Sequence, residues 1–310
     1  MKRLALAILA CCIAVGVTAA ECRTLQYAEK GGEKLYLDHY PAVGVDGARP
    51  CVIFAFGGGF VRGSRNEKYY EAYFDALTQA GYDVVSIDYR LGLKNPPKDL
   101  GIRGLISLMQ QSVDYAAEDL MSATRFVLDN AVAWNIDPTK IVVSGSSAGA
   151  IATLQAENYI CNRKPIATEI LGDYNFAGVV AFAGAVFSVG GRPTWKGETC
   201  PVMMFHGTSD SNVPYNKASI FGIGFYGSKL IAKQLKRKGG SYWFHSAKYR
   251  SHIIAGEPMV LNTREIIDFI EKCVKGGQHL QVTTEVEDKA YGKQPTRFSV
   301  KEYLSSNYAQ

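Results

Sequence analysis

A serine between two glycines is the residue best placed to do chemistry. The segment "IVVSGSSAGA" (141–150) contains GSSAG (145–149), a G-x-S-x-G pattern centred on Ser147. A β-branched run precedes the pattern and a helical pattern follows it, which is the context of a nucleophile elbow. Such a turn would expose the Ser147 hydroxyl near a helix N-terminus, where developing negative charge is favoured. Ser144 and Ser146 flank the pattern but do not occupy its centre.

A serine hydroxyl is a poor nucleophile at neutral pH, so it needs a base that is held by a third group. In enzymes built on this elbow, an acid and then a histidine follow later in the chain. "MMFHGTSDSNVPY" (203–215) is an apolar strand that runs into a polar turn carrying Asp210. We predict Asp210 as the acid, and we expect His206 to be structural because it lies in the strand itself.

Three histidines follow Asp210, namely His245, His252 and His279. His245 lies inside the alternating strand "SYWFHS", and His279 lies in the tail after the last helix. His252 lies in the loop after that strand, from which it could reach back over the sheet edge. We predict His252 as the base, with His245 as the alternative.

Strands and helices alternate along the chain and would position these residues. The expected strands are 34–40, 51–56, 83–89, 141–145, 177–184, 202–207 and 241–246. The expected helices are 67–80, 116–135, 149–160, 227–240 and 263–277. This alternation predicts a mostly parallel α/β sheet flanked by helices, with ligands bound at the carboxyl ends of its strands.

Some segments do not follow the alternation. Residues 91–118 and 185–200 are long for connections, and we expect them to form insert loops over the active site. The tail 277–310 is polar. The sequence therefore predicts a single domain over 21–310, with its core at about 34–275.

The N-terminus has a basic start, an apolar run and then small residues, which predicts a signal peptide over 1–20 that is cleaved after Ala19 or Ala20. Export to the periplasm or the medium follows from this prediction. The alternative of a stable membrane anchor is weaker because the apolar run is short for a span. Lipid anchoring through Cys11 or Cys12 is weaker still, because the apolar run continues past both.

Charge and cysteine content exclude some classes of protein. The chain carries 34 basic and 29 acidic residues, and loss of residues 1–20 leaves a net charge of +3, which is too mild to suggest nucleic acid binding.

The cysteines that remain after loss of residues 1–20 are Cys22, Cys51, Cys161, Cys200 and Cys273. Their odd number leaves at least one unpaired, and Cys161–Cys200 is the candidate disulfide. No spacing resembles a zinc site, and nothing in the sequence indicates the oligomeric state.

Three consecutive glycines end the apolar strand of "CVIFAFGGGF" (51–60). Glycine loses the most backbone freedom on folding, so a triplet is costly unless something must approach the backbone closely. Attack of Ser147 on an ester would create an oxyanion, which preorganised backbone N–H groups would have to meet. The triplet therefore predicts a loop beside the nucleophile.

These motifs, in this order, resemble the α/β-hydrolase superfamily. Within it they resemble the HGGG-type esterases, which include hormone-sensitive-lipase-like carboxylesterases and secreted feruloyl and acetyl-xylan esterases. The resemblance covers roughly residues 34–275. It is carried by "YLDHYP", "FGGGFVRGS", "VVSIDYRL", "ATRFVLDNAVAWNIDPTKIVVSGSSAG", "HGTSDSNVPY" and the late His252.

The resemblance implies a secreted carboxylic ester hydrolase that needs no cofactor or metal. Ser147, Asp210 and His252 would form its triad, and its substrate would be a small-molecule or carbohydrate-linked ester. It also implies an oxyanion hole, whose donors would be the backbone N–H groups of Gly58, Gly59 and Ala148.

The sequence departs from the family at Phe56, where the motif usually has a histidine that helps to shape the loop. This departure bears on loop geometry and rate. Two alternatives stay open. One is a prolyl-oligopeptidase-like peptidase, because "HGTSDSNVP" occurs in that branch too. The other is a hydrolase-fold protein that binds without catalysis, which Phe56 alone supports.

Overall fold

The structure is a computed structural model, and it describes residues 22–97, 99–288, 290 and 291. The signal peptide expected over 1–20 lies outside the described residues. Among the residues described, no helix is both long enough and apolar enough to cross a lipid bilayer.

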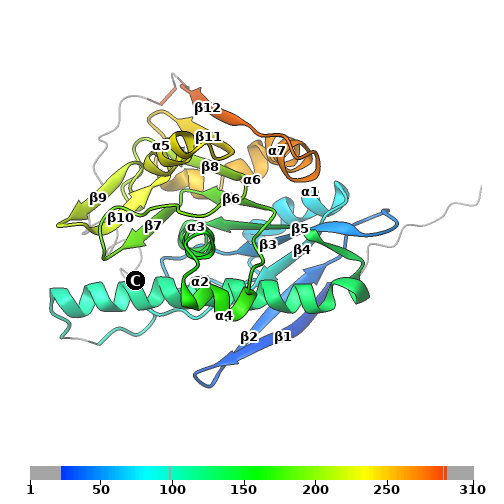
Figure 1. Cartoon of the computed structure of the whole chain (residues 1–310), viewed down its shortest axis with the longest axis horizontal. Coiled ribbons are helices and arrows are strands. Elements are labelled where there is room, and N and C mark those ends of the chain that lie inside the picture. The colour runs from blue at the N-terminus through cyan, green and yellow to red at the C-terminus, as the bar shows by residue number, and fades with distance from the viewer. Residues whose placement is uncertain (1–21, 98, 289, 292–310) are drawn as a thin grey trace, which may run out of the picture.

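A nine-stranded sheet runs through the molecule in the order β1-β2-β4-β3-β5-β6-β8-β11-β12 (Figure 1). The pairings from β4 to β12 are parallel, whereas β1 and β2 are antiparallel. This arrangement confirms the predicted mostly parallel sheet. The strands are β1 (Arg23–Lys30), β2 (Glu33–Tyr40), β3 (Arg49–Ala55), β4 (Asp83–Ile87), β5 (Ile136–Ser146), β6 (Gly178–Phe182), β8 (Val202–Gly207), β11 (Tyr242–Ala247) and β12 (Gln281–Val286).

Helices cover both faces of this sheet (Figure 1). On one face α2, α3 and α4 contact one another, and on the other face α1, α6 and α7 do so. The helices are η1 (Lys68–Tyr70), α1 (Glu71–Gln79), α2 (Ile102–Trp134), α3 (Ala148–Cys161), α4 (Pro165–Leu171), α5 (Ser228–Lys238), η2 (His252–Ala255), α6 (Pro258–Leu261), α7 (Thr263–Phe269) and the π-helix η3 (Ile270–Lys275).

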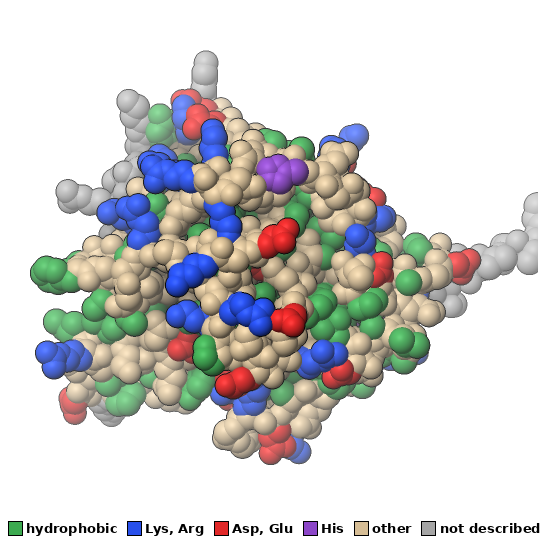
Figure 2. All heavy atoms as spheres, viewed as in Figure 1, with side chains coloured by type: hydrophobic (Ala, Val, Ile, Leu, Met, Phe, Trp, Pro, Cys, Tyr) green, Lys and Arg blue, Asp and Glu red, His purple; other side chains and the backbone are tan. Residues whose placement is uncertain are grey.

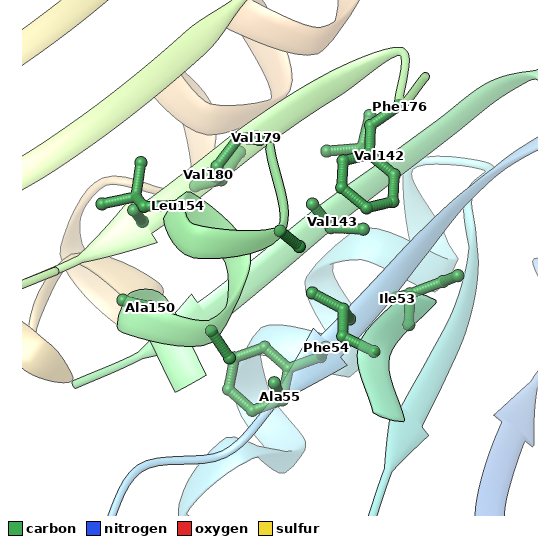
Figure 3. Packing of buried hydrophobic residues seen from close by; sticks show 14 of the residues in the cluster. Ile53, Phe54, Ala55, Val142, Val143, Ala150, Leu154, Phe176, Val179 and Val180 are labelled. Carbon is green, nitrogen blue, oxygen red and sulfur yellow. The ribbon is translucent and has the colours of Figure 1, made fainter. Parts of the chain in front are cut away.

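Part of the core lies between the central strands and α3 (Figure 3). Val143 on β5, Val179 on β6 and Leu154 on α3 are fully buried. Burying one such side chain stabilises the fold by about 1.5–3 kcal/mol. Because both faces of these strands are covered, their sequences are continuous apolar runs, which made them readable from the sequence.

The prediction that residues 91–118 form an insert loop is wrong for most of that segment. From Ile102 onward it belongs to α2, a single helix of 33 residues that ends at Asn135 in the left-handed conformation. The buried positions Met109 and Val113 continue the apolar stripe of the later part of the helix. The buried residues therefore keep helical spacing along the whole of α2. The prolines and glycines that suggested a loop lie mostly before the helix begins.

A second sheet of three strands is absent from the sequence prediction. It consists of β7 (Ala185–Ser188), β10 (Ile223–Gly227) and β9 (Lys217–Ile220), in that order. The predicted insert 185–200 thus contains a strand as well as a loop. Part of the polar tail is also ordered, because β12 pairs in parallel with β11 at the sheet edge.

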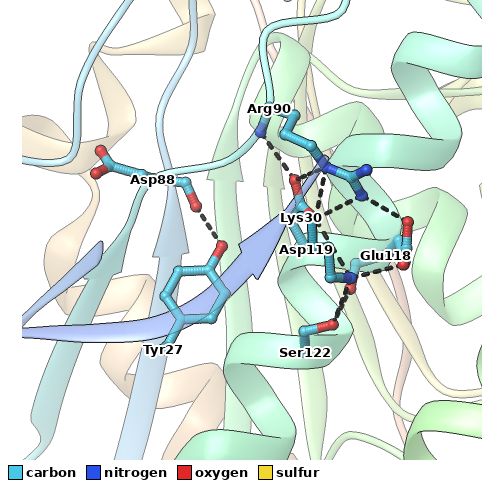
Figure 4. A network of polar contacts seen from close by, with 7 residues as sticks. All are labelled: Tyr27, Lys30, Asp88, Arg90, Glu118, Asp119 and Ser122. Carbon is cyan, nitrogen blue, oxygen red and sulfur yellow. Dashed lines mark hydrogen bonds and ion pairs between the residues drawn. The ribbon is translucent and has the colours of Figure 1, made fainter. Parts of the chain in front are cut away.

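A buried charge network attaches α2 to the end of β4 (Figure 4). Asp119 is completely buried and accepts hydrogen bonds from the Arg90 side chain, including one of 2.7 Å from Nη2. Arg90 also pairs with Glu118, and Lys30 on β1 donates to Glu118 and Ser122. Removing one partner of such a buried pair typically costs about 3–5 kcal/mol, so this network stabilises the position of α2.

The expected disulfide is not formed. Cys161 and Cys200 are both buried free thiols. The Cys161 thiol contacts the Asn158 carbonyl, while the Cys200 N–H donates to the Glu157 carboxylate at 3.0 Å. The Cys200 thiol also hydrogen-bonds the Glu157 carboxyl group, so each thiol has a polar partner of its own.

Candidate active site

The predicted elbow joins β5 to α3, with Ser147 as the turning residue. Its backbone has φ +49° and ψ −111°, in a region that non-glycine residues rarely occupy. The Ser147 N–H donates to the Phe182 carbonyl on β6 at 2.9 Å, which ties the turn to the neighbouring strand. Strain of this kind is held by surrounding structure and is common at functional sites.

Both glycines of the elbow are required by close packing. A Cβ on Gly145 would lie 2.4 Å from the Gly149 backbone, and a Cβ on Gly149 would lie 2.0 Å from the Ala55 carbonyl oxygen. Neither distance is possible without a shift of backbone. The start of α3 therefore packs directly on the end of β3, from which the glycine loop continues.

The structure brings together the three side chains predicted as nucleophile, base and acid. Ser147 Oγ lies 2.8 Å from His252 Nε2, and His252 Nδ1 lies 2.8 Å from Asp210 Oδ2. Ser147 follows β5, Asp210 follows β8, and His252 begins η2 after β11. The His252 side chain is 22 % exposed and that of Asp210 is fully buried, so solvent reaches the base but not the acid.

Asp210 is held as a carboxylate despite its burial. Burial raises the pKa of its carboxyl, but the charge of His252 and hydrogen bonds from His206 and His252 outweigh that effect and place the pKa well below the ordinary value. Its Oδ1 also accepts N–H groups of Asn212 and Val213, each at 2.9 Å. The carboxylate is therefore charged and fixed in orientation at neutral pH.

His206 has more contact with this site than the sequence interpretation allowed. Its Nε2 lies 3.4 Å from Asp210 Oδ2 and 3.1 Å from the Val213 carbonyl, and its Nδ1 lies 2.8 Å from Ser228 Oγ. The ring is fully buried, so it is structural as predicted, but it also adjoins the acid. The sequence offered one indication of this contact, namely that His206 lies only four residues before Asp210.

The other two candidate histidines lie elsewhere. His245 on β11 packs against Phe205 with ring centroids 5.1 Å apart, and burial lowers the pKa of its imidazole. His279 Nε2 lies 2.7 Å from the Gly239 carbonyl. Of the three, only His252 contacts Ser147.

The glycine loop lies beside the elbow, as expected. Its own backbone conformation is a further reason why glycine is required there. Gly58 has φ +123° and Gly59 has φ +64°. A Cβ on Gly58 would lie 2.1 Å from the Arg62 carbonyl oxygen. The Gly57 N–H donates to Tyr70 Oη at 3.0 Å, so that N–H is already engaged. The loop's own backbone thus requires glycine, before any substrate is considered.

A hollow of about 300 Å³ lies beside Ser147 and His252. Several of its polar lining residues were not singled out from the sequence, because only the fold brings them here. It is lined by Gly57, Gly58, Arg62, Gly63, Glu67, Tyr70, Ser146, Ser147, Asn212 and His252. Ser147, His252 and the loop glycines Gly57 and Gly58 therefore border one solvent-accessible space.

Phe56 fixes the start of the glycine loop by packing. Its ring is buried and stacks on Tyr89, with centroids 4.4 Å apart and planes inclined by 23°. Tyr89 Oη donates to the Phe56 carbonyl at 2.8 Å. A Cβ on Gly63 would lie 2.5 Å from the Phe56 ring, so the returning loop covers it closely.

Comparison with known proteins places the N-terminal half of the chain beside esterases. Residues 16–156 match the model of the Carboxylesterase family. The chain is 34% identical over 111 residues to fumonisin B1 esterase of Sphingopyxis macrogoltabida, covering 34% of this chain and 19% of the relative. It is 31% identical over 122 residues to acetylcholinesterase of Gallus gallus, covering 39% and 15% respectively. Neuroligin-2 of Mus musculus is 30% identical over 109 residues, covering 34% and 11%.

These curated relatives are matched over about a fifth of their length or less. Solved structures match far more of the chain. Esterase 2 of Thermogutta terrifontis phosphoramylated by tabun has a TM-score of 0.61 at 21% identity, covering 84% of this chain and 96% of that one. The apo form of the same esterase also has a TM-score of 0.61, at 19% identity. The chain has the α/β-hydrolase fold.

Proposed function

We propose that this chain is a serine carboxylesterase. The observation that carries the proposal is the continuous contact from Ser147 Oγ through the His252 ring to Asp210, with both links at 2.8 Å. The similarity of residues 16–156 to the Carboxylesterase family supports ester hydrolysis as the reaction. No observation favours the peptidase alternative.

In the proposed reaction, His252 Nε2 accepts the Ser147 proton while Oγ attacks the ester carbonyl carbon. The Nδ1–H of His252 donates to Asp210, which holds the ring in the required tautomer and stabilises the imidazolium. The carbonyl then re-forms, the ester C–O bond breaks, and His252 gives its proton to the departing alcohol. Water repeats the same steps on the acyl-serine and releases the acid.

The oxyanion would be stabilised by backbone N–H groups on both sides of the hollow. Ala148 is the first residue of α3, where N–H groups have no acceptor within the helix. Gly58 and Gly59 are the proposed donors from the glycine loop, which lies beside the elbow. Donors fixed by packing need no reorganisation as charge develops, which is why such groups contribute strongly to rate.

The substrate class and location are finer proposals. We propose an ester of a small molecule or of a carbohydrate, because the hollow is polar and open. We also propose export, on the signal peptide expected over residues 1–20. Protein sequencing of exported material should then begin at Ala20 or Glu21, whereas a retained Met1 would contradict export by cleavage.

Ser147→Ala tests the catalytic role directly. It should lower hydrolysis of p-nitrophenyl acetate by several orders of magnitude and abolish labelling by a fluorophosphonate, with circular dichroism unchanged. Ser146→Ala is the matched control. Its Oγ donates to the Ala255 carbonyl in η2, so this variant should lose some rate but still label.

The possible outcomes separate the hypotheses. Exchanged phenotypes of the two serine variants would show that the elbow is misplaced. A folded parent protein that neither labels nor turns over esters would favour the binding protein without catalysis. Hydrolysis of an aminoacyl-nitroanilide in the absence of ester turnover would favour the peptidase.

A further inference from the structure

A line of hydrogen bonds joins the three segments that carry the groups proposed for catalysis. The Gly57 N–H donates to Tyr70 Oη at 3.0 Å. The Tyr70 hydroxyl is hydrogen-bonded in turn to the Ser146 side chain. Ser146 Oγ donates to the Ala255 carbonyl at 2.8 Å, and Ala255 ends the helix η2 that His252 begins. These contacts, which we call the hydroxyl bridge, connect the glycine loop to the elbow and the elbow to η2.

The hydroxyl bridge runs in one direction and carries no charge. The Gly57 N–H can only donate and the Ala255 carbonyl can only accept, so each hydroxyl between them accepts from one neighbour and donates to the next, which strengthens the bonds. Lys and Arg side chains gather over α5 and toward α3 (Figure 2), whereas the bridge consists of two hydroxyls, an N–H and a carbonyl. The bridge should therefore hold across the pH range in which His252 becomes neutral.

The Tyr70 ring is fixed by aromatic packing, so its hydroxyl has a defined position. The ring is buried, and its centroid lies 4.7 Å from that of Phe54 and 6.2 Å from that of Phe74. Phe54 lies on β3, from which the glycine loop continues, so ring and loop are anchored to the same strand. Burial raises the pKa of the Tyr70 hydroxyl, which therefore stays protonated at neutral pH and able to donate.

The bridge lies where the glycine loop and the elbow touch. A Cβ on Gly57 would lie 3.0 Å from Ser146 Oγ, so the two segments are in close contact here. Gly57 shares a peptide unit with Gly58, the first donor proposed for the oxyanion. Ser146 immediately precedes the proposed nucleophile Ser147. Loss of the Tyr70 hydroxyl would therefore loosen the distance between oxyanion donor and nucleophile, and a displacement of about 1 Å can cost about a hundredfold in rate.

We infer that Tyr70 is a positioning residue for the proposed ester hydrolysis, and that it sets the glycine loop against Ser147 through the Ser146 hydroxyl. The inference rests on the proposed function and adds to it a residue that takes no part in the proton transfers. Its contribution is realised in the transition state, because the ester carbonyl of the ground state carries no full charge for the loop to stabilise.

Tyr70→Phe removes the hydroxyl and keeps the ring. It should lower kcat for p-nitrophenyl acetate at least tenfold, by the same factor at every pH, and leave KM within twofold. A trifluoromethyl ketone, whose adduct with Ser147 carries an oxyanion, should also bind at least tenfold more weakly. Tyr73→Phe is the matched control, because Tyr73 is also buried and packs on Phe54, but its Oη lies 3.2 Å from Ser144 Oγ, outside the bridge. It should keep kcat and ketone affinity within twofold of the parent.

A double variant tests whether Tyr70 acts through Ser146. Breaking the bridge once should remove most of its effect, so Tyr70→Phe/Ser146→Ala should lose about as much kcat as Tyr70→Phe alone. Losses that multiply would show that the two hydroxyls act separately and would overturn the inference. A parent-like kcat in Tyr70→Phe, a rise in KM alone, or an equal loss in Tyr73→Phe would overturn it as well.

Hydrogen exchange separates failure of this inference from failure of the proposed function. If Ser147→Ala hydrolyses esters like the parent, the proposed function is wrong. Exchange followed by mass spectrometry needs no activity: Tyr70→Phe should speed exchange in the glycine loop, and Tyr73→Phe should not. Unchanged exchange of that loop in Tyr70→Phe would overturn the positioning role, whatever the activity of Ser147→Ala.

Discussion

Replacing Phe56 tests whether packing alone positions the glycine loop. We expect Phe56→Ala to lower kcat/KM for p-nitrophenyl acetate by about a hundredfold, because a displacement of about 1 Å in a catalytic group can cost that much. The ring is buried against Tyr89 at 4.4 Å, and its carbonyl accepts the Tyr89 hydroxyl. Removing the ring leaves the start of the loop held by that hydrogen bond and by the one from the Gly57 N–H to Tyr70 Oη.

The expected losses follow from these contacts. A buried Phe→Ala change typically costs about 3–5 kcal/mol of stability, and the offset stack contributes about 0.5–1.5 kcal/mol beyond area burial. Tyr89→Phe removes only the hydroxyl and should cost about 1 kcal/mol with a smaller loss of rate. Phe56→His keeps most of the volume and restores the polar group usual in the family, so it should retain more activity than Phe56→Ala.

The assay must separate loop position from general stability. We would measure kcat/KM at a temperature where circular dichroism shows every variant folded. Phe269→Ala is the control, because Phe269 is equally buried but lies on α7, on the opposite face from α3. It should lose stability and keep its rate. Unchanged kcat/KM in Phe56→Ala, or an equal loss in Phe269→Ala, would refute the reasoning.

Two further predictions concern pH. Ester hydrolysis should rise with pH, since His252 must be neutral to accept a proton, while the lowered pKa of Asp210 keeps that group charged. His252→Ala should be almost inactive and His245→Ala active, and the reverse pattern in rate assays would transfer the role of base to His245. Burial raises the pKa of Glu157 from 4.5 to about 7, so its contribution to stability is complete below pH 4.5 and is lost as pH rises through about 7. Glu157→Gln should reduce by about 3 kcal/mol the loss in free energy of unfolding between low and high pH. Urea denaturation of parent and variant at pH 5 and pH 8 measures this loss, and an equal loss in both proteins would contradict the prediction.

The centre of the fold was predictable because its signals are local. Strands β3, β5 and β8 are covered on both faces, so their apolar runs are visible without knowing their neighbours. The elbow is equally local, since strand, turn and helix are adjacent in the chain. Ser147 could therefore be selected from ten residues of sequence.

The periphery was less predictable because its elements depend on partners distant in sequence. Strand β12 is largely exposed and pairs through its backbone with β11, so "QVTTEV" shows little apolar pattern. Strand β9 likewise has no buried residue and forms a hairpin with β10, of which only the second half is buried. The contact of His206 with Asp210 depends on a turn whose shape no local pattern indicates.

The convergence of Ser147, Asp210 and His252 follows from the register of the parallel strands. Ser146 on β5 lies beside Phe182 on β6, Phe182 lies beside Phe205 on β8, and Phe205 lies beside His245 on β11. Strands β5 and β6 end at this row of paired residues, and β8 and β11 end two residues beyond it. Segments that leave the strands at this edge share the space above it, which is how residues 42 and 105 positions apart come into contact. The sequence order of Ser147, Asp210 and His252, the proposed nucleophile, acid and base, thus reflects the spatial order of β5, β8 and β11 along that edge.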